Sequence, residues 1–127
     1  MEVKKVNRIL LDNSNKETIN IKEDTNLLIK DVTREKIIFN IYDANLNILV
    51  IASNSKKKTY ELNIYGGCVS FNNISYDSAG SDICVNLNKE KSSITIHNTL
   101  FSKAKEICNI KMNHNFPLTN SDIYNNG

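Results

Sequence analysis

The sequence contains no long hydrophobic run and no excess of charge of one sign. Its 127 residues include 16 lysines and arginines and 14 aspartates and glutamates, which gives a net charge of +2 at pH 7. This balance provides no electrostatic basis for binding nucleic acid or an anionic membrane. No apolar stretch approaches the length of a membrane span, and the first ten residues lack the apolar core of a signal peptide. We therefore expect a cytoplasmic protein with no nucleic-acid or membrane partner.

Cysteine and histidine are both scarce, and neither is spaced for a local metal chelate. The three cysteines (Cys68, Cys84 and Cys108) are odd in number and widely separated, which argues against a disulfide framework and fits a reducing compartment. The two histidines, His97 and His114, form no C-x-x-C or H-x-x-x-H type of motif with them. Cys84 and His97 are weak candidates for a shared metal, which would require their strands to stack as neighbours with both side chains outward.

A strand predicted at 107–114 places Cys108 and His114 on its apolar side. They would lie about 20 Å apart in a fully extended strand, which is too far for both to bind one metal ion. We therefore expect Cys108 to be a small buried hydrophobe. His114 is expected to be a structural, hydrogen-bonded histidine at the edge of the strand.

Sequence motifs for catalysis are also missing. There is no Walker-type glycine loop, so the chain itself is not expected to hydrolyse ATP, and there is no nucleophile-elbow sequence. The acidic residues Glu23, Asp24, Asp77 and Asp82 fall in polar segments that we predict to be solvated loops. The basic run 56–58 is predicted to be an exposed turn. The sequence therefore gives no reason to expect an enzyme.

Strand periodicity, in contrast, runs through most of the chain. Alternation of apolar and polar residues with many β-branched side chains predicts short, half-buried strands. These segments are 19–21, 38–42, 47–51, 60–65, 83–87, 94–96 and 107–114. Their spacing fits either a β-sandwich or a coiled β-solenoid, and periodicity alone does not separate the two.

Three further features leave alternatives open. The pair Gly66–Gly67 predicts either a hairpin turn or a tight corner. The segment 103–106 has helical propensity but is too short for a stable helix, so we expect a turn or a single helical turn. The 21 asparagines and 17 isoleucines suggest an AT-rich genome, which makes the asparagine content weak support for any binding role.

The segment from Ile107 to Gly127 joins an alternating strand to a polar turn and a second short strand. The first strand ends in His114, the turn contains Pro117, and Thr119 and Ser121 precede a tyrosine and a glycine. This order, together with the strand and charged turn at 85–93, resembles the SufB/SufD family of iron–sulfur cluster assembly scaffolds.

The resemblance covers residues 35–127, and most clearly 83–127, with residues 1–34 as an N-terminal cap or first rungs. It implies a right-handed parallel β-helix with a helical segment that docks a SufC-like ABC ATPase. It also implies a transient iron–sulfur cluster in the complete assembly, but none in this chain. No sequence here matches the docking segment or the cluster-forming residues, so we expect a truncated or reduced member. His114, Pro117, Thr119 and Ser121 are assigned a structural role.

Together these observations predict one all-β domain over residues 1–127. The expected fold is a right-handed parallel β-helix open at its C-terminal end, with an antiparallel β-sandwich as the alternative. The expected function is a non-catalytic scaffold of the SUF-type iron–sulfur assembly system. Its partners would be a SufC-like ATPase and a SufB/SufD-like chain, with homo- or hetero-oligomers forming through the edge at 110–124. The alternatives are a sandwich-type or cupin-like ligand-binding domain, and a metalloenzyme using Cys84 and His97.

Overall fold

The computed structural model describes residues 7–11, 18–30, 36–53, 57–76, 80–101 and 108–126. These residues form eleven β-strands. The described part of the chain contains no helix that could cross a membrane. The strands are β1 (Asn7–Leu11), β2 (Thr18–Ile21), β3 (Thr25–Lys30), β4 (Lys36–Tyr42), β5 (Leu46–Ser53), β6 (Lys58–Tyr65), β7 (Cys68–Tyr76), β8 (Ser81–Leu87), β9 (Ser93–Phe101), β10 (Cys108–His114) and β11 (Asn120–Asn126). The predictions for Asp77 and for 103–106 concern positions outside the described residues.

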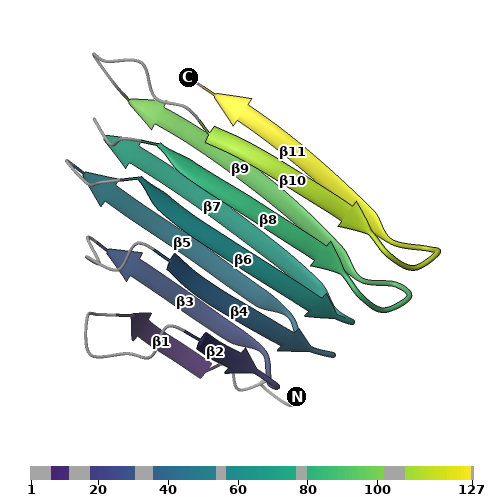
Figure 1. Ribbon diagram of the computed structural model, residues 1–127. Helices are drawn as coiled ribbons and strands as arrows, with labels where there is room; N and C mark the ends of the chain where they lie inside the picture. Colours follow the sequence, from purple (N-terminus) through teal and green to yellow (C-terminus); the bar gives the residue numbers. More distant parts are fainter. Residues whose placement is uncertain are drawn as a thin grey trace, which may run out of the picture.

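The strands build two parallel sheets that face each other in a β-solenoid (Figure 1). One sheet has the order β1-β3-β5-β7-β9-β11, and the other has the order β10-β8-β6-β4-β2. Each coil therefore contributes one strand to each sheet, and the chain advances in the right-handed sense that parallel β crossovers favour. The predicted parallel β-helix is confirmed. The antiparallel sandwich is wrong, because every described strand pair is parallel.

The coils lengthen toward the C-terminus. The register pairs Asn7 with Thr25, which makes the first coil 18 residues long. It pairs Ser93 with Asn120, which makes the last coil 27 residues long. The N-terminal segment belongs to the same stack, since β1, β2 and β3 continue the two sheets as first rungs.

The core consists of ladders of apolar side chains, one from each coil. Along the five-stranded sheet, Ile41, Ile64 and Leu87 occupy equivalent inward positions and are fully buried. Phe39 and Phe71 fill the space between the sheets and are 0% exposed. Burying a side chain of this size stabilises the fold by about 1.5–3 kcal/mol. The alternation seen in the sequence reflects this pattern, with one face of each strand in the core and the other in solvent.

The Gly66–Gly67 pair forms a tight corner between the two sheets, so its interpretation as a hairpin is wrong. It joins β6 to β7, which belong to different sheets. Both glycines adopt positive φ, 93° and 97°, a conformation that other residues rarely take. A Cβ atom on Gly67 would overlap the backbone carbonyl oxygen of Ala44 in the coil below. The corner therefore requires glycine because adjacent turns stack in direct contact.

Two predictions of solvated loops are also wrong. Lys58 is only 7% exposed and begins β6, while its neighbour Lys57 remains exposed. Asp82 lies within β8, where its carboxylate accepts a hydrogen bond from the Asn109 amide at 3.0 Å. The same carboxylate forms an ion pair with the Lys57 ammonium at 3.2 Å. In both cases the strand begins earlier than the polar composition of the segment indicates.

Candidate functional site at the C-terminal coil

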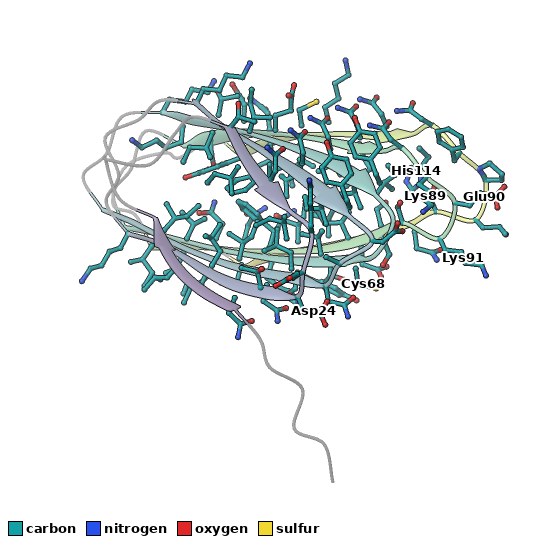
Figure 2. All side chains as sticks on the ribbon, turned by 90° about the horizontal axis from the view of Figure 1, so that it is seen from below. Asp24, Cys68, Lys89, Glu90, Lys91 and His114 are labelled. Carbon is teal, nitrogen blue, oxygen red and sulfur yellow. The ribbon has the colours of Figure 1, made fainter. Side chains whose placement is uncertain are left out.

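The turns that lead from the five-stranded to the six-stranded sheet lie along one edge of the solenoid. They comprise residues 22–24, 43–45, 66–67, 88–92 and 115–119. Figure 2 shows Asp24, Lys89, Lys91 and His114 along this edge. The last two turns are the longest, so the edge widens at the C-terminal end of the stack.

The last coil leaves both sheets open. Within the described part of the chain, β10 pairs only with β8, and β11 pairs only with β9. The final layer of the core is consequently exposed on one side. Ile123 is 42% exposed, although Ile96, its equivalent one coil earlier, is 0% exposed. Ile110 and Met112 are likewise only partly buried.

Large exposed apolar side chains concentrate in this coil. Phe116 is 47%, Leu118 68% and Tyr124 52% exposed, in addition to Ile123. Elsewhere in the described residues only Tyr42 and Leu49 belong to this class. We call the four side chains of the last coil, Phe116, Leu118, Ile123 and Tyr124, the C-terminal patch. An apolar patch beside open sheet edges is typical of a protein-binding surface.

The turn that carries Phe116 and Leu118 is fixed by backbone hydrogen bonds to the preceding turn. The Lys91 amide donates to the Leu118 carbonyl at 3.2 Å, and the Asn120 amide donates to the Ser92 carbonyl at 3.1 Å. Leu118 itself adopts φ 60°, which is unfavourable for a residue with a side chain. These contacts hold Leu118 in place, and its side chain is 68% exposed.

His114, Thr119 and Ser121 come together at the same end. His114 Nδ1 lies 2.7 Å from Thr119 Oγ1, and His114 Nε2 lies 3.0 Å from Ser121 Oγ. The Thr119 hydroxyl donates its proton to the Phe116 carbonyl at 3.1 Å, so it accepts from Nδ1–H. Nε2 of a neutral His114 is then the acceptor for the Ser121 hydroxyl. Pro117, the fourth residue of the motif, lies exposed in the turn between them.

The register explains why these polar groups meet. His114 occupies the inward position held by Leu87 one coil earlier, and Ser121 occupies that of Ile94. The last coil thus replaces two apolar core positions with a hydrogen-bonded polar pair that tolerates contact with water. The group that orients His114 is a hydroxyl, and it lacks the negative charge with which a catalytic triad stabilises the imidazolium. His114 and its two hydroxyl partners are therefore better placed to cover the end of the core than to carry out nucleophilic catalysis.

Cys84 and His97 lie on opposite outer faces of the solenoid. Cys84 occupies an outward position of β8 in the five-stranded sheet. His97 occupies an outward position of β9 in the six-stranded sheet, where its ring stacks on Tyr124 at a centroid distance of 4.9 Å. The core lies between the two side chains, which leaves no shared metal site. No cluster of three potential metal ligands occurs among the described residues.

The other two cysteines occupy different places in the coil. Cys68 is exposed at the start of β7, where its sulfur accepts a hydrogen bond from the Ser93 hydroxyl at 2.9 Å. Cys108 begins β10, and its side chain is not among those described, so its expected burial stays a prediction.

Sequence reasoning missed an asparagine ladder on the outer face of the five-stranded sheet. Each amide Nδ2 donates to the Oδ1 of the preceding coil over 2.8 to 3.1 Å. The five members of this outer ladder are Asn20, Asn40, Asn63, Asn86 and Asn113. A detectable signal existed, since each asparagine stands between two inward-facing residues at intervals close to one coil. The high asparagine content thus has a structural role.

A second ladder lies inside the last three coils. Asn73 and Asn98 are 2% and 1% exposed, in positions that the earlier coils fill with Ile29 and Val50. Asn73 donates to Asn98 at 3.4 Å, and Asn98 donates to Asn125 at 3.0 Å. Buried amides require such partners because an unpaired one would lose its hydrogen bonds to water. The interior therefore becomes more polar toward the C-terminal end.

No protein-family model, no curated protein and no solved structure matches this chain. The geometry of the C-terminal coil is consequently the main guide to function.

Proposed function

We propose that this chain is a non-catalytic scaffold that acts through protein partners bound at its C-terminal coil. The observation that carries the proposal is the coincidence of two open parallel sheet edges with the C-terminal patch. An incoming strand would satisfy the free backbone groups of β10 or β11 and cover the last apolar layer. Covering Leu118 and Ile123 would supply the hydrophobic part of the binding free energy.

The chemistry of this end supports a scaffold more than an enzyme. His114 has both ring nitrogens engaged, by Thr119 and Ser121. These bonds order the turn that presents Phe116 and Leu118. The proposed role of the polar residues is therefore to shape the binding surface.

We place this scaffold in the cytoplasm, as a component of SUF-type iron–sulfur cluster assembly. The support is the resemblance of the segment containing His114, Pro117, Thr119 and Ser121 to SufB/SufD proteins, together with the parallel β-helix that this resemblance implies. The partners would be a SufC-like ABC ATPase and a SufB/SufD-like chain. The cupin-like alternative requires a hydrophilic pocket inside a closed barrel or between two sheets, whereas here the apolar Phe39 and Phe71 are buried between the two parallel sheets.

Co-purification tests both the proposed scaffold role and the proposed assignment to iron–sulfur cluster assembly. The tagged chain is expressed with a SufC-like ATPase and a SufB/SufD-like chain, and complexes are isolated without oxygen. We expect recovery of both partners with the wild type and loss of recovery with Leu118→Asp, which places a charge in the patch. Leu49→Asp is the matched control, because Leu49 is also an exposed leucine but lies on the outer face of β5. Failure to recover either partner would refute the iron–sulfur assignment.

A second result would refute the broader scaffold proposal. If Leu118→Asp and Leu49→Asp were equivalent in every binding assay, including assays for self-association, the C-terminal patch would not be a binding surface. Circular dichroism of both variants verifies that the strands remain folded.

A further inference from the structure

The open end of the solenoid has a step. β10 is the last strand of the five-stranded sheet, and β11, which follows it along the chain, is the last strand of the six-stranded sheet. Because each coil contributes one strand to each sheet, the six-stranded sheet ends half a coil beyond the other (Figure 1). A strand added beside β10 would therefore lie opposite β11, across the core.

We infer that this step binds a second copy of this chain in a closed dimer, whose two-fold axis runs along the strands. Rotation about this axis turns the stack end over end and exchanges the positions of the two sheets. β11 of each copy then lies beside β10 of the other, and both strand pairs form together. This inference rests on the proposed scaffold function, since it names a partner for the same C-terminal coil.

The step distinguishes this arrangement from the other ways of joining two copies. A two-fold axis perpendicular to the sheets would pair β11 with β11 but leave the two β10 strands separated by the width of one strand. Head-to-tail stacking of β1 on β11 would leave the same gap between β2 and β10. With the axis along the strands, both sheets continue from one copy into the other. The two sheets of one copy run in opposite directions, so the new pairs are antiparallel (Figure 1).

The symmetry also fixes the register of the new strand pairs. Rotation about an axis along the strands leaves the position of every residue along the strand unchanged. Within one copy, His114 lies across the core from Ser121, with Nε2 and Oγ 3.0 Å apart. His114 therefore comes to lie opposite Ser121 of the second copy, and Met112 opposite Ile123 of the second copy.

This register sets like residues against each other in the core. Met112 is only partly buried and Ile123 is exposed in one copy, so each would cover the other. The hydrogen-bonded pair of His114 and Ser121 would meet the same polar pair of the second copy. One layer is mixed, because Ile110 would lie opposite Asn125 of the second copy. We therefore expect a dimer that dissociates on dilution.

The outer face adds a match of charge. In the same register Lys111 lies opposite Tyr124 of the second copy, and Asp122 of the second copy is its diagonal neighbour. Diagonal neighbours across antiparallel strands lie about 7–8 Å apart, within reach of a long side chain. Lys111 and Asp122 are both exposed, and neither forms an ion pair with another described residue. The symmetry repeats the contact on the opposite face of the dimer.

The outer asparagine ladder is compatible with this contact. Asn113 donates to Asn86, so within the described residues Asn113 Oδ1 is the acceptor left at the open end. The carboxylate of Asp122 of the second copy would lie opposite it and is also an acceptor. Lys111 projects from the same face two residues away, and its ammonium can donate to both groups.

The dimer would divide the C-terminal patch between two uses. Ile123 would be covered by Met112 of the second copy, and Tyr124 would lie against Lys111 of the second copy. The rotation leaves the two turns 115–119 at the same edge of the dimer, next to each other. Phe116 and Leu118 of both copies would therefore remain available to the other partners of the scaffold.

Sedimentation velocity over a concentration series is the first test. A closed dimer uses the open C-terminal end of both copies, so the sedimentation coefficient should rise with concentration and reach a plateau at the dimer. A chain that stays monomeric at its highest soluble concentration overturns the inference. A coefficient that keeps rising beyond the dimer overturns it as well, because that is the behaviour of an open stack.

A charge exchange is the second test, and it examines the register. Lys111→Glu alone and Asp122→Lys alone each place like charges at both contacts, and we expect the association constant to fall about tenfold. In an equimolar mixture of the two variants, the heterodimer has opposite charges at both contacts, so association should return. Lys36→Glu is the matched control, because Lys36 is an exposed lysine of β4, a strand with neighbours on both sides. It should associate as the wild type does.

The outcomes separate this inference from the proposed function. Association that neither single variant weakens, or that the mixture does not restore, overturns the two-fold pairing of β10 with β11. If Leu118→Asp still abolishes binding to other proteins in that case, the scaffold proposal stands without this dimer. If the mixture restores the dimer while Leu118→Asp leaves the binding of other proteins unchanged, the dimer stands and the scaffold proposal fails.

Discussion

The Lys89 ammonium donates to both carboxylate oxygens of Asp43, at 2.8 and 2.9 Å, although one coil separates the two residues. Asp43 belongs to the turn between β4 and β5, and Lys89 to the turn between β8 and β9. The corner Gly66–Gly67 lies between these turns. A Cβ atom on Gly66 would overlap Asp43 Oδ1 and approach the Lys89 side chain. The missing side chain is thus what allows the ion pair to span two coils.

The corner predicts unequal effects of three substitutions on stability. Gly67→Ala combines a strained positive φ with overlap on the Ala44 backbone, so we expect a loss of about 3 kcal/mol. Gly66→Ala is strained as well, but it meets mainly the Asp43 side chain, which can move. Lys89→Ala removes an ion pair between groups 53% and 67% exposed, and should cost about 0.5 kcal/mol. Urea unfolding measures all three, and a Lys89→Ala loss equal to that of Gly67→Ala would contradict this account.

The outer ladder predicts that stability depends on position within it. Asn63 bonds to both Asn40 and Asn86, so Asn63→Ala should destabilise the fold by about 1–2 kcal/mol. Asn20→Ala removes a single bond at the exposed end, and we expect about half that loss or less. Urea denaturation with linear extrapolation compares the two variants. Equal losses would mean that the ladder contributes through the propensity of each strand and not through its bonds.

Much of the fold follows from the sequence, because inward and outward residues alternate visibly in β4, β6 and β8. The predicted strands do not include β1, β3 or β7. β1 and β3 contain consecutive apolar residues, and β7 carries a buried asparagine, Asn73, at an inward position, so neither case shows a clear alternation. Leu28 stands between two buried residues and is itself half-exposed, so composition conceals its outward direction. A strand of this kind is recognisable only once the neighbouring coil shows which positions align.

The candidate site was harder to predict from the sequence than the fold. The order of His114, Thr119 and Ser121 is visible in the sequence, but their contact depends on two sheets facing each other across a turn. That arrangement is a property of the coil and not of local spacing. Conversely, stacking Cys84 beside His97 assumed that successive strands are neighbours, whereas successive strands in a solenoid belong to opposite sheets.

Stability at acidic pH should depend on Asp82. Its hydrogen bond from Asn109, together with the contact to Lys57, lowers the pKa of the Asp82 carboxyl below its ordinary value. A carboxyl with a lowered folded-state pKa stabilises the fold above its unfolded pKa, about 3.9, and this contribution is lost as the pH falls through the folded pKa. Asp82→Asn should therefore lower the melting temperature at neutral pH. The difference from the wild type should shrink below about pH 4.

A series of melting temperatures from neutral to acidic pH checks this prediction. Asp122→Asn serves as the control, since Asp122 is an exposed aspartate at the edge of the stack. A difference between wild type and Asp82→Asn that stays constant down to the lowest pH would show that the ionised carboxylate is not what stabilises β8.

Stability at alkaline pH should depend on Tyr60. Its side chain is 2% exposed and packs edge-on against Phe71 at a centroid distance of 5.4 Å, and this burial raises the pKa of the Tyr60 hydroxyl. The neutral form therefore persists in the folded state while the unfolded chain ionises near pH 10. Stability is fully present below that pH and falls as the pH rises above it. We expect Tyr60→Phe to unfold over a shallower alkaline limb than the wild type, and Tyr124→Phe, altered at a solvent-exposed ring, to follow the wild type. Thermal unfolding between about pH 8 and pH 11 measures the slopes, and identical limbs for Tyr60→Phe and wild type would show that Tyr60 does not control the alkaline transition.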